Sequence, residues 1–280
     1  MSNLLQKKER SIMNGLFNLD GKVCVVTGGT GILGTLYCRR LAEAGAHVVV
    51  SDLMPERCEA LAQEISSAVG CRALGLSVDL SVEASVKAWA KRIVEEFGSV
   101  DVLINNAAAK SKDFFAPLEK FSLQDWNDVM AVNVTGMFLT VRELGPVMVE
   151  KGKGSIINIS SIYGVVGPDQ RIYEGSWYEE MGGAINTPLI YSTTKGAVIA
   201  MTKYLATYWG PKGVRTNTLT PGGVSSGQNS IFSEKYSSRV PLGRMAQAEE
   251  MVGALIFLAS DASSYVNGQN IIVDGGLTAW

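Results

Sequence analysis

The chain has 280 residues, of which 46% are hydrophobic and 19% are charged, and its formal net charge at pH 7 is −2. This length and apolar content suit one large α/β domain, which we expect over residues 16–280. A charge so close to neutral excludes the basic surface that binds nucleic acid or an anionic membrane, so we expect neither as a partner.

The first residues and the cysteines predict a soluble cytoplasmic protein. The opening MSNLLQKKERSIMNG is charged where a signal peptide needs an apolar core, and no run of 18 apolar residues follows it. We expect residues 1–15 to be a flexible arm, with Met1 or Met13 as the translational start. The four cysteines lack CxxC spacing and His47 is the only histidine, so no metal site is expected.

A glycine-rich turn follows the first expected strand. KVCVV at 22–26 is typical of a buried parallel strand, and TGGTGILG at 27–34 leads into an amphipathic helix. The turn has GxGxxG spacing, which lets the backbone approach a pyrophosphate at a helix N-terminus. A glycine-rich turn without a ligand is the alternative. The cofactor contacts expected from this turn are Gly28, Thr30, Gly31, Ile32 and Leu33.

An aspartate ends the second expected strand, HVVVS at 47–51. The Asp52 carboxylate can accept hydrogen bonds from both adenosine ribose hydroxyls and would repel a 2′-phosphate, so NAD is predicted in preference to NADP. Leu53 is expected to contact the same cofactor. The alternative role of Asp52 is to cap the helix that begins near Pro55, and the two roles can coexist.

Strands and helices continue to alternate after residue 55. We expect helices at 55–69 and 82–97, and strands at 73–78, in VDVLINNAAA, and in GSIINISS at 154–161. This alternation predicts a doubly wound parallel sheet, or Rossmann fold, of about seven strands with helices on both faces and ligands at the carboxyl ends of the strands. The cofactor contacts expected at that edge are Asp79, Leu80, Asn106, Ala107 and Ala108. Ordinary turn chemistry is the alternative for the asparagine–alanine segment.

A tyrosine and a lysine lie four residues apart in LIYSTTKGAVIAM, at 189–201. Residues at i and i+4 share a helix face, so Tyr191 and Lys195 look into the same space. A neighbouring cation favours the phenolate and suits the tyrosine to acid–base work on a carbonyl or an alcohol. The motif alone is weak, and a surface tyrosine and lysine on an ordinary helix are the alternative.

Taken in order, these motifs resemble the short-chain dehydrogenase/reductase family, from about Leu16 to Trp280. The shared features are the TG-rich turn, Asp52, Asp79, NNAA, Asn133, NISS, YSTTK, PGG at 221–223 and VNGQNIIVDGG at 266–276. The resemblance implies a catalytic tetrad of Asn133, Ser161, Tyr191 and Lys195.

The resemblance also implies a role for each member of the tetrad. Tyr191 passes a proton to or from the substrate oxygen, and Ser161, preferred over Ser160, orients that oxygen. Lys195 holds the nicotinamide ribose and lowers the pKa of Tyr191, while Asn133 anchors a water that links the lysine to solvent. Tyr191 and Lys195 are therefore expected to contact the cofactor as well.

Two departures from the family pattern stand out. The glycine turn reads TGxxGxxG in place of the commoner TGxxxGxG, and the gap between Ser161 and Tyr191 is longer than the resemblance implies. We expect an insertion at about 163–188 that overhangs the catalytic groups. Its aromatic residues Tyr163, Tyr173, Trp177 and Tyr178 are predicted substrate contacts, and its acidic residues Asp169, Glu174, Glu179 and Glu180 are predicted acceptors.

Stacking faces beside acceptors suit a polyhydroxylated ligand such as a sugar, and a subunit contact is the alternative. NISSIYGVVGP followed by IYEGS also resembles short-chain dehydrogenases associated with flagellin and surface-polysaccharide sugar modification. In the family, the long segment 224–244 folds over substrate and nicotinamide, which implies cofactor contacts at Pro221, Gly222 and Val224. A disordered surface excursion is the alternative for this segment.

The resemblance implies a homodimer or homotetramer that pairs through the last strand and helix. The predicted function is an NAD-dependent oxidoreductase that interconverts a secondary alcohol and a ketone on a sugar or sugar-derived substrate. The alternatives are a 3-oxoacyl or polyol/steroid reductase of the same family, and a dinucleotide-sensing protein without catalysis.

Overall fold

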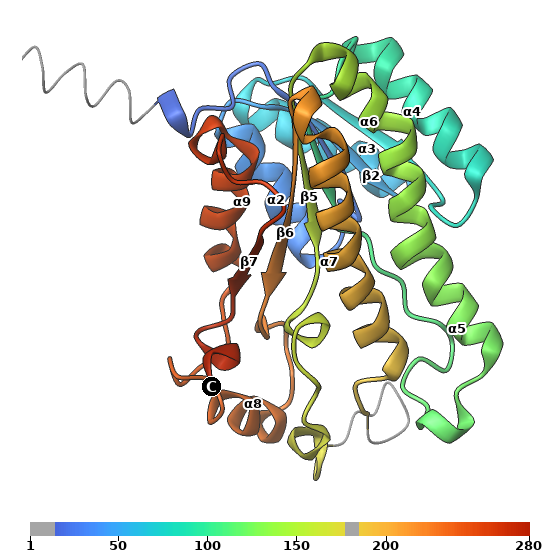
Figure 1. Cartoon of the computed structure of the whole chain (residues 1–280), viewed down its shortest axis with the longest axis vertical. Helices are drawn as coiled ribbons and strands as arrows, with labels where there is room; N and C mark the ends of the chain where they lie inside the picture. The colour runs from blue at the N-terminus through green and yellow to red at the C-terminus, as the bar shows by residue number, and fades with distance from the viewer. Residues whose placement is uncertain (1–14, 177–184) are drawn as a thin grey trace, which may run out of the picture.

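The computed structural model describes residues 15–176 and 185–280. Seven parallel strands form one sheet in the order β3-β2-β1-β4-β5-β6-β7, with helices packed around it (Figure 1). The predicted doubly wound fold is thereby confirmed. The strands are β1 (Val23–Thr27), β2 (His47–Asp52), β3 (Ala73–Ser77), β4 (Val102–Asn105), β5 (Gly154–Ile159), β6 (Val214–Pro221) and β7 (Asn270–Val273).

Each face of the sheet packs against its own set of helices because successive strand residues point to opposite faces. In β1, Cys24 and Val26 pack with α2 (Ile32–Glu43), α3 (Pro55–Val69) and α9 (Val252–Ala259). Val23 and Val25 pack on the other side, with α4 (Glu83–Phe97), α6 (Met137–Lys151) and α7 (Leu189–Trp209). The strand order reverses between β1 and β4, where a crevice opens at the carboxyl edge.

A π-helical turn interrupts the helical segment that begins at Leu123. A short α5 (Leu123–Met130) continues through a π-helical turn, Ala131–Gly136, into α6. Asn133 lies in this wide turn and is buried. A π-helical turn shifts the register of the side chains that follow it, and such turns are common at functional sites.

A chain of buried side-chain hydrogen bonds ties the central strands to α6 and α7. Thr140 on α6 donates to Asn105 Oδ1 at 2.7 Å, and Asn105 Nδ2 donates to Asn158 Oδ1 at 2.9 Å. Asn158 Nδ2 and the Thr218 hydroxyl then both donate to Thr202 Oγ1 on α7, at 2.9 and 2.8 Å. The helix that carries Tyr191 and Lys195 is thus anchored through its interior polar groups.

The segment 224–244 is folded, so the alternative of a disordered excursion is wrong. It contains α8 (Ser230–Ser237), whose Phe232 and Tyr236 are buried with Ile162, which follows β5, and with Ile172 of the predicted insertion. Asn229 caps α8 by accepting a hydrogen bond from Phe232 N at 2.8 Å. The two segments that follow β5 and β6 therefore pack against each other beyond the carboxyl edge of the sheet.

Candidate active site

Ser161, Tyr191 and Lys195 meet at the carboxyl end of β5. Tyr191 lies in the first turn of α7 and lines the same cavity as Ser161, which follows β5. Lys195 is buried one helical turn further on, and its Nζ donates to the carbonyl oxygen of Ile159 at 3.0 Å. The spacing of Tyr191 and Lys195 thus places both side chains beside the end of one strand, as the sequence predicts.

The two serines at the end of β5 have different surroundings. The Ser160 hydroxyl donates to the backbone carbonyl of Lys195 at 2.8 Å, so it holds β5 against α7. The Ser161 oxygen faces a cavity and accepts a hydrogen bond from Tyr163 N at 3.3 Å. Only Ser161 of this pair is placed to meet a ligand.

Burial sets the ionisation of the tyrosine and the lysine. Burial raises the pKa of Tyr191, and the hydrogen bond from Ser161 offsets part of this rise. Burial lowers the pKa of Lys195 to about 8. The expectation that Lys195 lowers the pKa of Tyr191 is not met in this structure, because loss of water around both groups penalises their charged forms. Lys195 Nζ lies 5.8 Å from the centroid of the Tyr191 ring.

Asn133 connects the loop after β4 to α7. Its Oδ1 accepts a hydrogen bond from Ala109 N at 2.8 Å, and its Nδ2 lies 3.5 Å from the Thr194 hydroxyl oxygen. The side chain therefore contacts the residue before Lys195 rather than Lys195 itself. Both polar atoms of this buried amide therefore have a hydrogen-bond partner, one in the loop after β4 and one on α7.

A first cavity, of about 570 Å³, lies above β1, β2 and β4. The glycine turn gives it room: a Cβ on Gly34 would lie 1.9 Å from the Gly28 carbonyl oxygen, and Gly28 has a φ of +62°. Gly31 caps α2 with no side chain, so the first amides of α2 are available to a phosphate. This cradle fits a dinucleotide. The predicted cofactor contacts that line it are Gly28, Thr30, Gly31, Ile32, Leu33, Asp52, Leu53, Asp79, Leu80, Asn106, Ala107 and Ala108.

Three predicted cofactor contacts do not line this first cavity. Gly222 and Val224 line the other cavity described below, and Pro221 lines neither. The segment that follows β6 begins beside the second cavity, which also contains Ser161 and Tyr191. The PGG motif therefore did not predict which of the two cavities this segment lines. Five further residues that were not predicted also line the first cavity: Gly34, Arg57, Val78, Ala109 and Val132. Most of these are immediate neighbours of predicted contacts.

Asp52 is held by the turn rather than by the helix that follows. Its carboxylate accepts hydrogen bonds from Thr30 N at 3.0 Å, the Thr30 hydroxyl at 2.7 Å and Leu53 N at 2.8 Å. Met54 is the N-cap residue of α3 and has no side-chain cap, so the capping alternative for Asp52 is wrong. Arg57 donates to Thr30 O at 3.0 Å and lines the same cavity. A carboxylate and a guanidinium thus share this end of it.

A second cavity, of about 530 Å³, contains Ser161 and Tyr191. Tyr163 and Tyr173 line it, as predicted, whereas Trp177 and Tyr178 lie outside the described residues. The Tyr173 hydroxyl is hydrogen-bonded to the Thr187 hydroxyl at 2.6 Å. The loop after β4 joins the two cavities, because residues 106–109 line the first and Lys110 lines the second.

Two predicted acceptors do not face this second cavity. Asp169 is paired with Arg171 and Arg239, which holds the pKa of its carboxyl at about 2, and neither Asp169 nor Glu174 lines the cavity. The expectation that these two carboxylates receive a ligand is therefore wrong. Glu179 and Glu180 lie outside the described residues. Among residues 15–176 and 185–280, the polar groups that line this cavity are hydroxyls, amides and one lysine.

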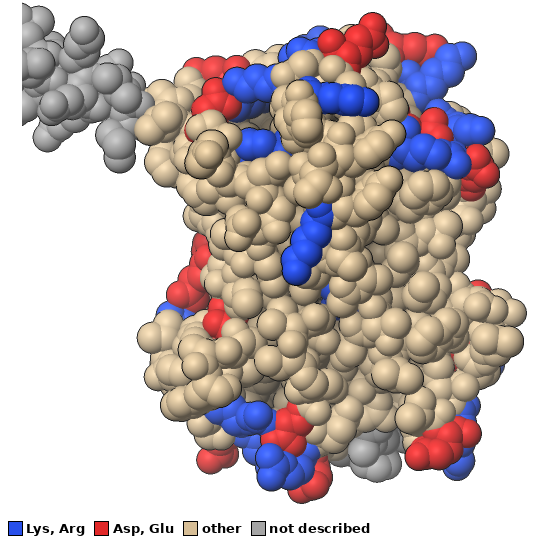
Figure 2. Space-filling view, viewed as in Figure 1, with Lys and Arg blue, Asp and Glu red and all other residues tan. Residues whose placement is uncertain are grey.

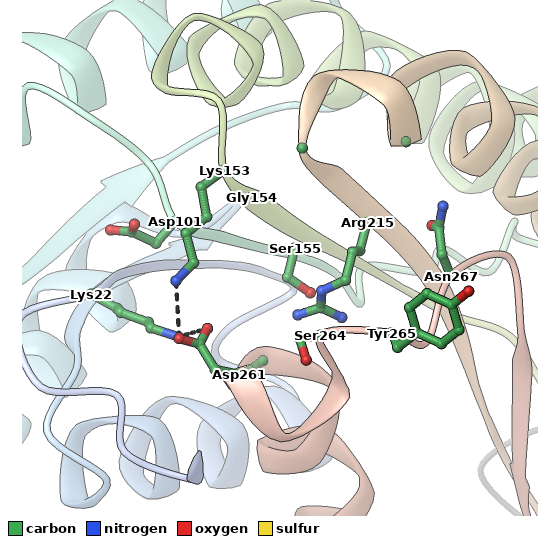
Figure 3. Close-up of a pocket in the computed structure, with 13 residues that line it drawn as sticks. Lys22, Asp101, Lys153, Gly154, Ser155, Arg215, Asp261, Ser264, Tyr265 and Asn267 are labelled. Atoms are coloured by element: carbon green, nitrogen blue, oxygen red, sulfur yellow. Dashed lines mark hydrogen bonds and ion pairs between the residues drawn. The ribbon is translucent and has the colours of Figure 1, made fainter. Parts of the chain in front are cut away.

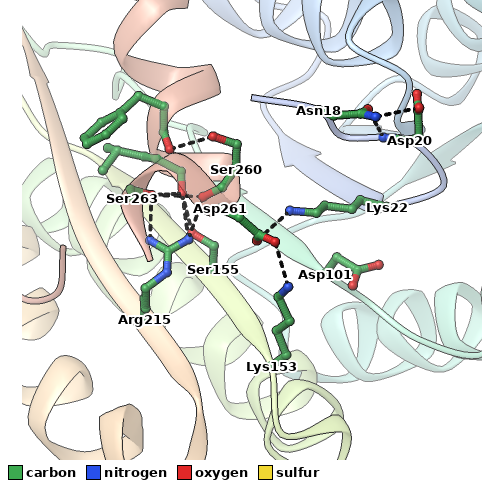
Figure 4. A network of polar contacts seen from close by, with 12 residues as sticks. Asn18, Asp20, Lys22, Asp101, Lys153, Ser155, Arg215, Ser260, Asp261 and Ser263 are labelled. Carbon is green, nitrogen blue, oxygen red and sulfur yellow. Dashed lines mark hydrogen bonds and ion pairs between the residues drawn. The ribbon is translucent and has the colours of Figure 1, made fainter. Parts of the chain in front are cut away.

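A third cavity, of about 580 Å³, opens at the opposite, amino edge of the sheet (Figure 3). Asp261 bridges Lys22 and Lys153 there, at 3.1 and 2.9 Å. Arg215 donates to the carbonyl oxygens of Leu258 and Ser260 at the end of α9, both at 3.2 Å (Figure 4). A cation near the C-terminal end of a helix stabilises that helix. We therefore interpret the charged residues of this third cavity as stabilising the fold.

Comparison with known proteins identifies the family. Residues 22–178 match the short chain dehydrogenase family, and residues 176–278 match the family described as enoyl-(acyl carrier protein) reductase. The chain therefore belongs to the short-chain dehydrogenase/reductase family. It is an oxidoreductase with a nicotinamide dinucleotide as its cofactor.

Two sequence relatives show the range of activities nearby. The chain is 34% identical to the D-threitol dehydrogenase of Mycolicibacterium smegmatis over 94% of this chain and 95% of that protein. It is also 34% identical to the 3-oxoacyl-(acyl-carrier-protein) reductase FabG of Aquifex aeolicus, over 92% of this chain and 98% of that protein.

Two solved structures show that the fold is shared closely. A gluconate 5-dehydrogenase from Burkholderia cenocepacia, in complex with NADP and tartrate, superposes with a TM-score of 0.85. It is 34% identical and covers 96% of this chain and 99% of its own. A short chain dehydrogenase from Leptospira borgpetersenii with bound NAD+ has a TM-score of 0.80 and 33% identity, over 93% of this chain and 94% of its own.

Neither a membrane span nor a metal cluster is found in the part of the chain that the structure describes. None of its helices is long and apolar enough to cross a membrane. Within the same ranges, no group of three or more histidine, cysteine, aspartate or glutamate side chains could hold a metal ion.

Proposed function

We propose that the chain is an NAD(H)-dependent enzyme that interconverts a secondary alcohol and a ketone on a sugar or sugar-derived substrate. The observation that carries the proposal is that Ser161 and Tyr191 line one cavity beside a dinucleotide cradle. The loop 106–110 lines both cavities, so a substrate and a nicotinamide would meet beside Tyr191.

The bound nicotinamide supplies or accepts the hydride, and the chain's own residues handle the proton and the oxygen. In the reducing direction, the Tyr191 phenol donates its proton to the carbonyl oxygen as the carbonyl carbon gains a hydride. Ser161 donates a hydrogen bond to the same oxygen and supports the charge that develops there. The raised pKa of Tyr191 keeps the phenol protonated and ready to donate.

Lys195 and Asn133 act behind the reacting groups. Lys195 is fixed on the Ile159 carbonyl, and we assign it the nicotinamide ribose because the family resemblance gives it that role. Once a ligand fills the cavity, the ammonium favours the phenolate that forms at Tyr191 after proton donation. Asn133 holds the loop 106–110 and α7 at a fixed separation through its bonds to Ala109 and Thr194.

NAD is preferred in this proposal because Asp52 places a negative charge at the ribose end of the first cavity. Arg57 opposes this preference, since it lines the same end and could pair with a 2′-phosphate. The Asp52 carboxylate is fixed by three hydrogen bonds, whereas Arg57 is an exposed side chain. We therefore give Asp52 the larger effect.

A carbohydrate substrate is supported by the polar groups of the second cavity and by the D-threitol and gluconate dehydrogenases among the relatives. The resemblance of the 158–176 region to enzymes of flagellin and surface-polysaccharide sugar modification favours a sugar made for a cell surface. The second candidate is a 3-oxoacyl reductase, favoured by the likeness to FabG and by the phenylalanines of the cavity.

We further propose a cytoplasmic homodimer or homotetramer built from one catalytic domain over residues 16–280. The edge strand β7 and the C-terminus expose Ile272 and Trp280. Figure 2 shows a broad, mostly uncharged area on one face, with a basic side chain near its centre and most of the charged residues gathered above and below it. Exposed aromatic residues Tyr204 and Tyr208 of α7 offer a second contact surface. Light scattering after size-exclusion chromatography measures the state, and a monomer would contradict the proposal.

The test of function is Tyr191→Phe, with Tyr204→Phe as the matched control. Tyr204 lies on the same helix but is exposed, so its hydroxyl is remote from the site. We expect Tyr191→Phe to lower turnover of D-threitol, D-gluconate or a 3-oxoacyl thioester by about 10²–10⁴-fold. NADH binding, followed by fluorescence, should stay within about twofold because the fold is unchanged. Full turnover in Tyr191→Phe would refute the hypothesis that Tyr191 is the proton donor.

A further inference from the structure

A lysine lines the second cavity. Among its lining residues that the structure describes, Lys110 is the single charged side chain. Lys110 forms no ion pair within the described ranges, and its Nζ lies 5.1 Å from the centroid of the Phe115 ring, which holds it by a cation–π contact. An ammonium that is oriented by an aromatic ring and lacks a carboxylate partner is available to an anion.

The other titratable groups of the cavity do not supply a balancing negative charge. Burial raises the pKa of Tyr163 and of Tyr173, and it raises the pKa of Tyr236 to about 12, so these phenols stay neutral. Asp169 lies outside the lining and is already paired with two arginines. The described lining of the cavity is therefore cationic at neutral pH.

The cation is placed at a distance from the reacting atoms. The Phe115 ring contacts the Phe114 ring with centroids 5.1 Å apart, and the Phe114 ring contacts the Tyr191 ring at 6.3 Å. Two aromatic rings thus separate Lys110 from the phenol. The Asn186 side-chain amide donates to the carbonyl oxygen of Phe115 at 3.1 Å, which fixes the loop that carries Lys110. A ligand that spans the cavity would have its reacting carbon at one end and Lys110 near the other.

We propose that Lys110 binds the carboxylate of a polyhydroxy acid, so that the substrate is a sugar acid rather than a neutral sugar or polyol. The proposal rests on the alcohol–ketone chemistry proposed above and specifies its substrate. A single lysine suits a carboxylate, whereas phosphate groups in proteins are bound by arginine forks, helix N-termini or several cations. The remaining hydroxyls and amides of the lining, from Thr187, Asn186, Ser226 and Gln228, suit the hydroxyl groups of such a chain.

The test compares Lys110→Met with Lys112→Met and uses a matched pair of substrates. Lys112 is in the same loop, is exposed and does not line the cavity, so it controls for loss of one positive charge. D-Gluconate and D-sorbitol have the same number of carbons and differ in charge. Turnover is measured with saturating cofactor, and Lys110→Arg tests rescue by a second cation.

We expect Lys110→Met to raise the KM for D-gluconate by about tenfold or more, since a charge-assisted hydrogen bond is lost. The loss in kcat/KM should be at least about fivefold greater for D-gluconate than for D-sorbitol, because only the acid has a partner for the ammonium. Lys112→Met should behave as the unaltered protein, and Lys110→Arg should recover most of the affinity. Equal effects of the two lysine variants, or equal losses for both substrates, would overturn the proposal.

A binding measurement tests the proposed anion site independently of the proposed enzymatic activity. Calorimetric titration of D-gluconate into the NADH-saturated protein reports the anion site even where no alcohol is turned over. Lack of turnover with every alcohol, together with gluconate binding that only Lys110→Met loses, would refute the proposed function and retain the anion site. Turnover of neutral alcohols, with gluconate binding that is absent or insensitive to Lys110, would retain the function and refute the anion site.

Discussion

The buried polar chain that anchors α7 makes Thr202→Val a sharp test of how the catalytic helix is held. Thr202 is buried, and its hydroxyl oxygen accepts hydrogen bonds from Asn158 Nδ2 and from the Thr218 hydroxyl. Valine has nearly the same shape, so the substitution removes polar partners without opening a cavity. Its β-branched side chain is also tolerated by the helix as threonine is.

The magnitude follows from the groups left without a partner. Asn158 Nδ2 is buried and would lose its only acceptor, while the Thr218 hydroxyl can rotate toward another oxygen. An unpaired buried donor costs about 1–3 kcal/mol, so one full loss and one partial loss lower the free energy of unfolding by about 2–4 kcal/mol. This is a large fraction of the roughly 5–15 kcal/mol by which domains are stable. The melting temperature should fall by about 3–7 °C.

The assay is urea unfolding followed by tryptophan fluorescence at equal protein concentrations, with Thr207→Val as the control. Thr207 lies on the same helix and is exposed, so its hydroxyl can be replaced by water. We expect Thr207→Val to change the stability by less than about 0.5 kcal/mol. Equal stabilities for the two valine variants would refute the reasoning that the buried chain anchors α7.

Two further predictions concern ionisation and the cofactor. Burial lowers the pKa of Lys195 from 10.5 to about 8, so the unfolded chain binds more protons between these pH values and the folded state gains stability as the pH rises. Relative to Lys195→Met, the unaltered protein should gain about 2–3 kcal/mol between pH 7.5 and 10.5 in urea unfolding, and parallel pH profiles would contradict the burial of this charge. Asp52→Ala should shift the ratio of Kd values toward NADPH by about tenfold, because it removes both a ribose acceptor and a repulsive charge. Fluorescence titration measures the ratio against Glu56→Ala, an exposed acid outside the cavity, and an unchanged ratio in Asp52→Ala would rule out Asp52 as the selector.

Short-range signals in the sequence were enough for the fold and for much of the site. Strand and helix periodicities depend on neighbouring residues, and their alternation allows few arrangements other than a doubly wound sheet. The glycine turn is equally local, since Gly34 must lie close to the Gly28 carbonyl only six residues earlier. The i and i+4 spacing of Tyr191 and Lys195 likewise placed both groups beside the end of β5.

The spacing of residues in the sequence did not predict the pKa values of the site residues or the ion pairs of the carboxylates. Lys195 was expected to lower the pKa of Tyr191, but burial by remote segments dominates both groups. Asp169 was expected to face a ligand, yet Arg239, far away in the sequence, folds back onto it. Arg171 is only two residues from Asp169 and was a local signal of this pairing.

The sequence by itself determined the order of strands and helices, the dinucleotide turn and the helical face shared by the phenol and the ammonium. These depend on backbone preferences and on contacts within a few residues. Only the tertiary structure decided which cavity each loop lines, which carboxylates are already paired, and that Lys110 lines the second cavity. Those properties depend on water exclusion and on charges brought together by segments distant in the chain, so no local pattern encodes them.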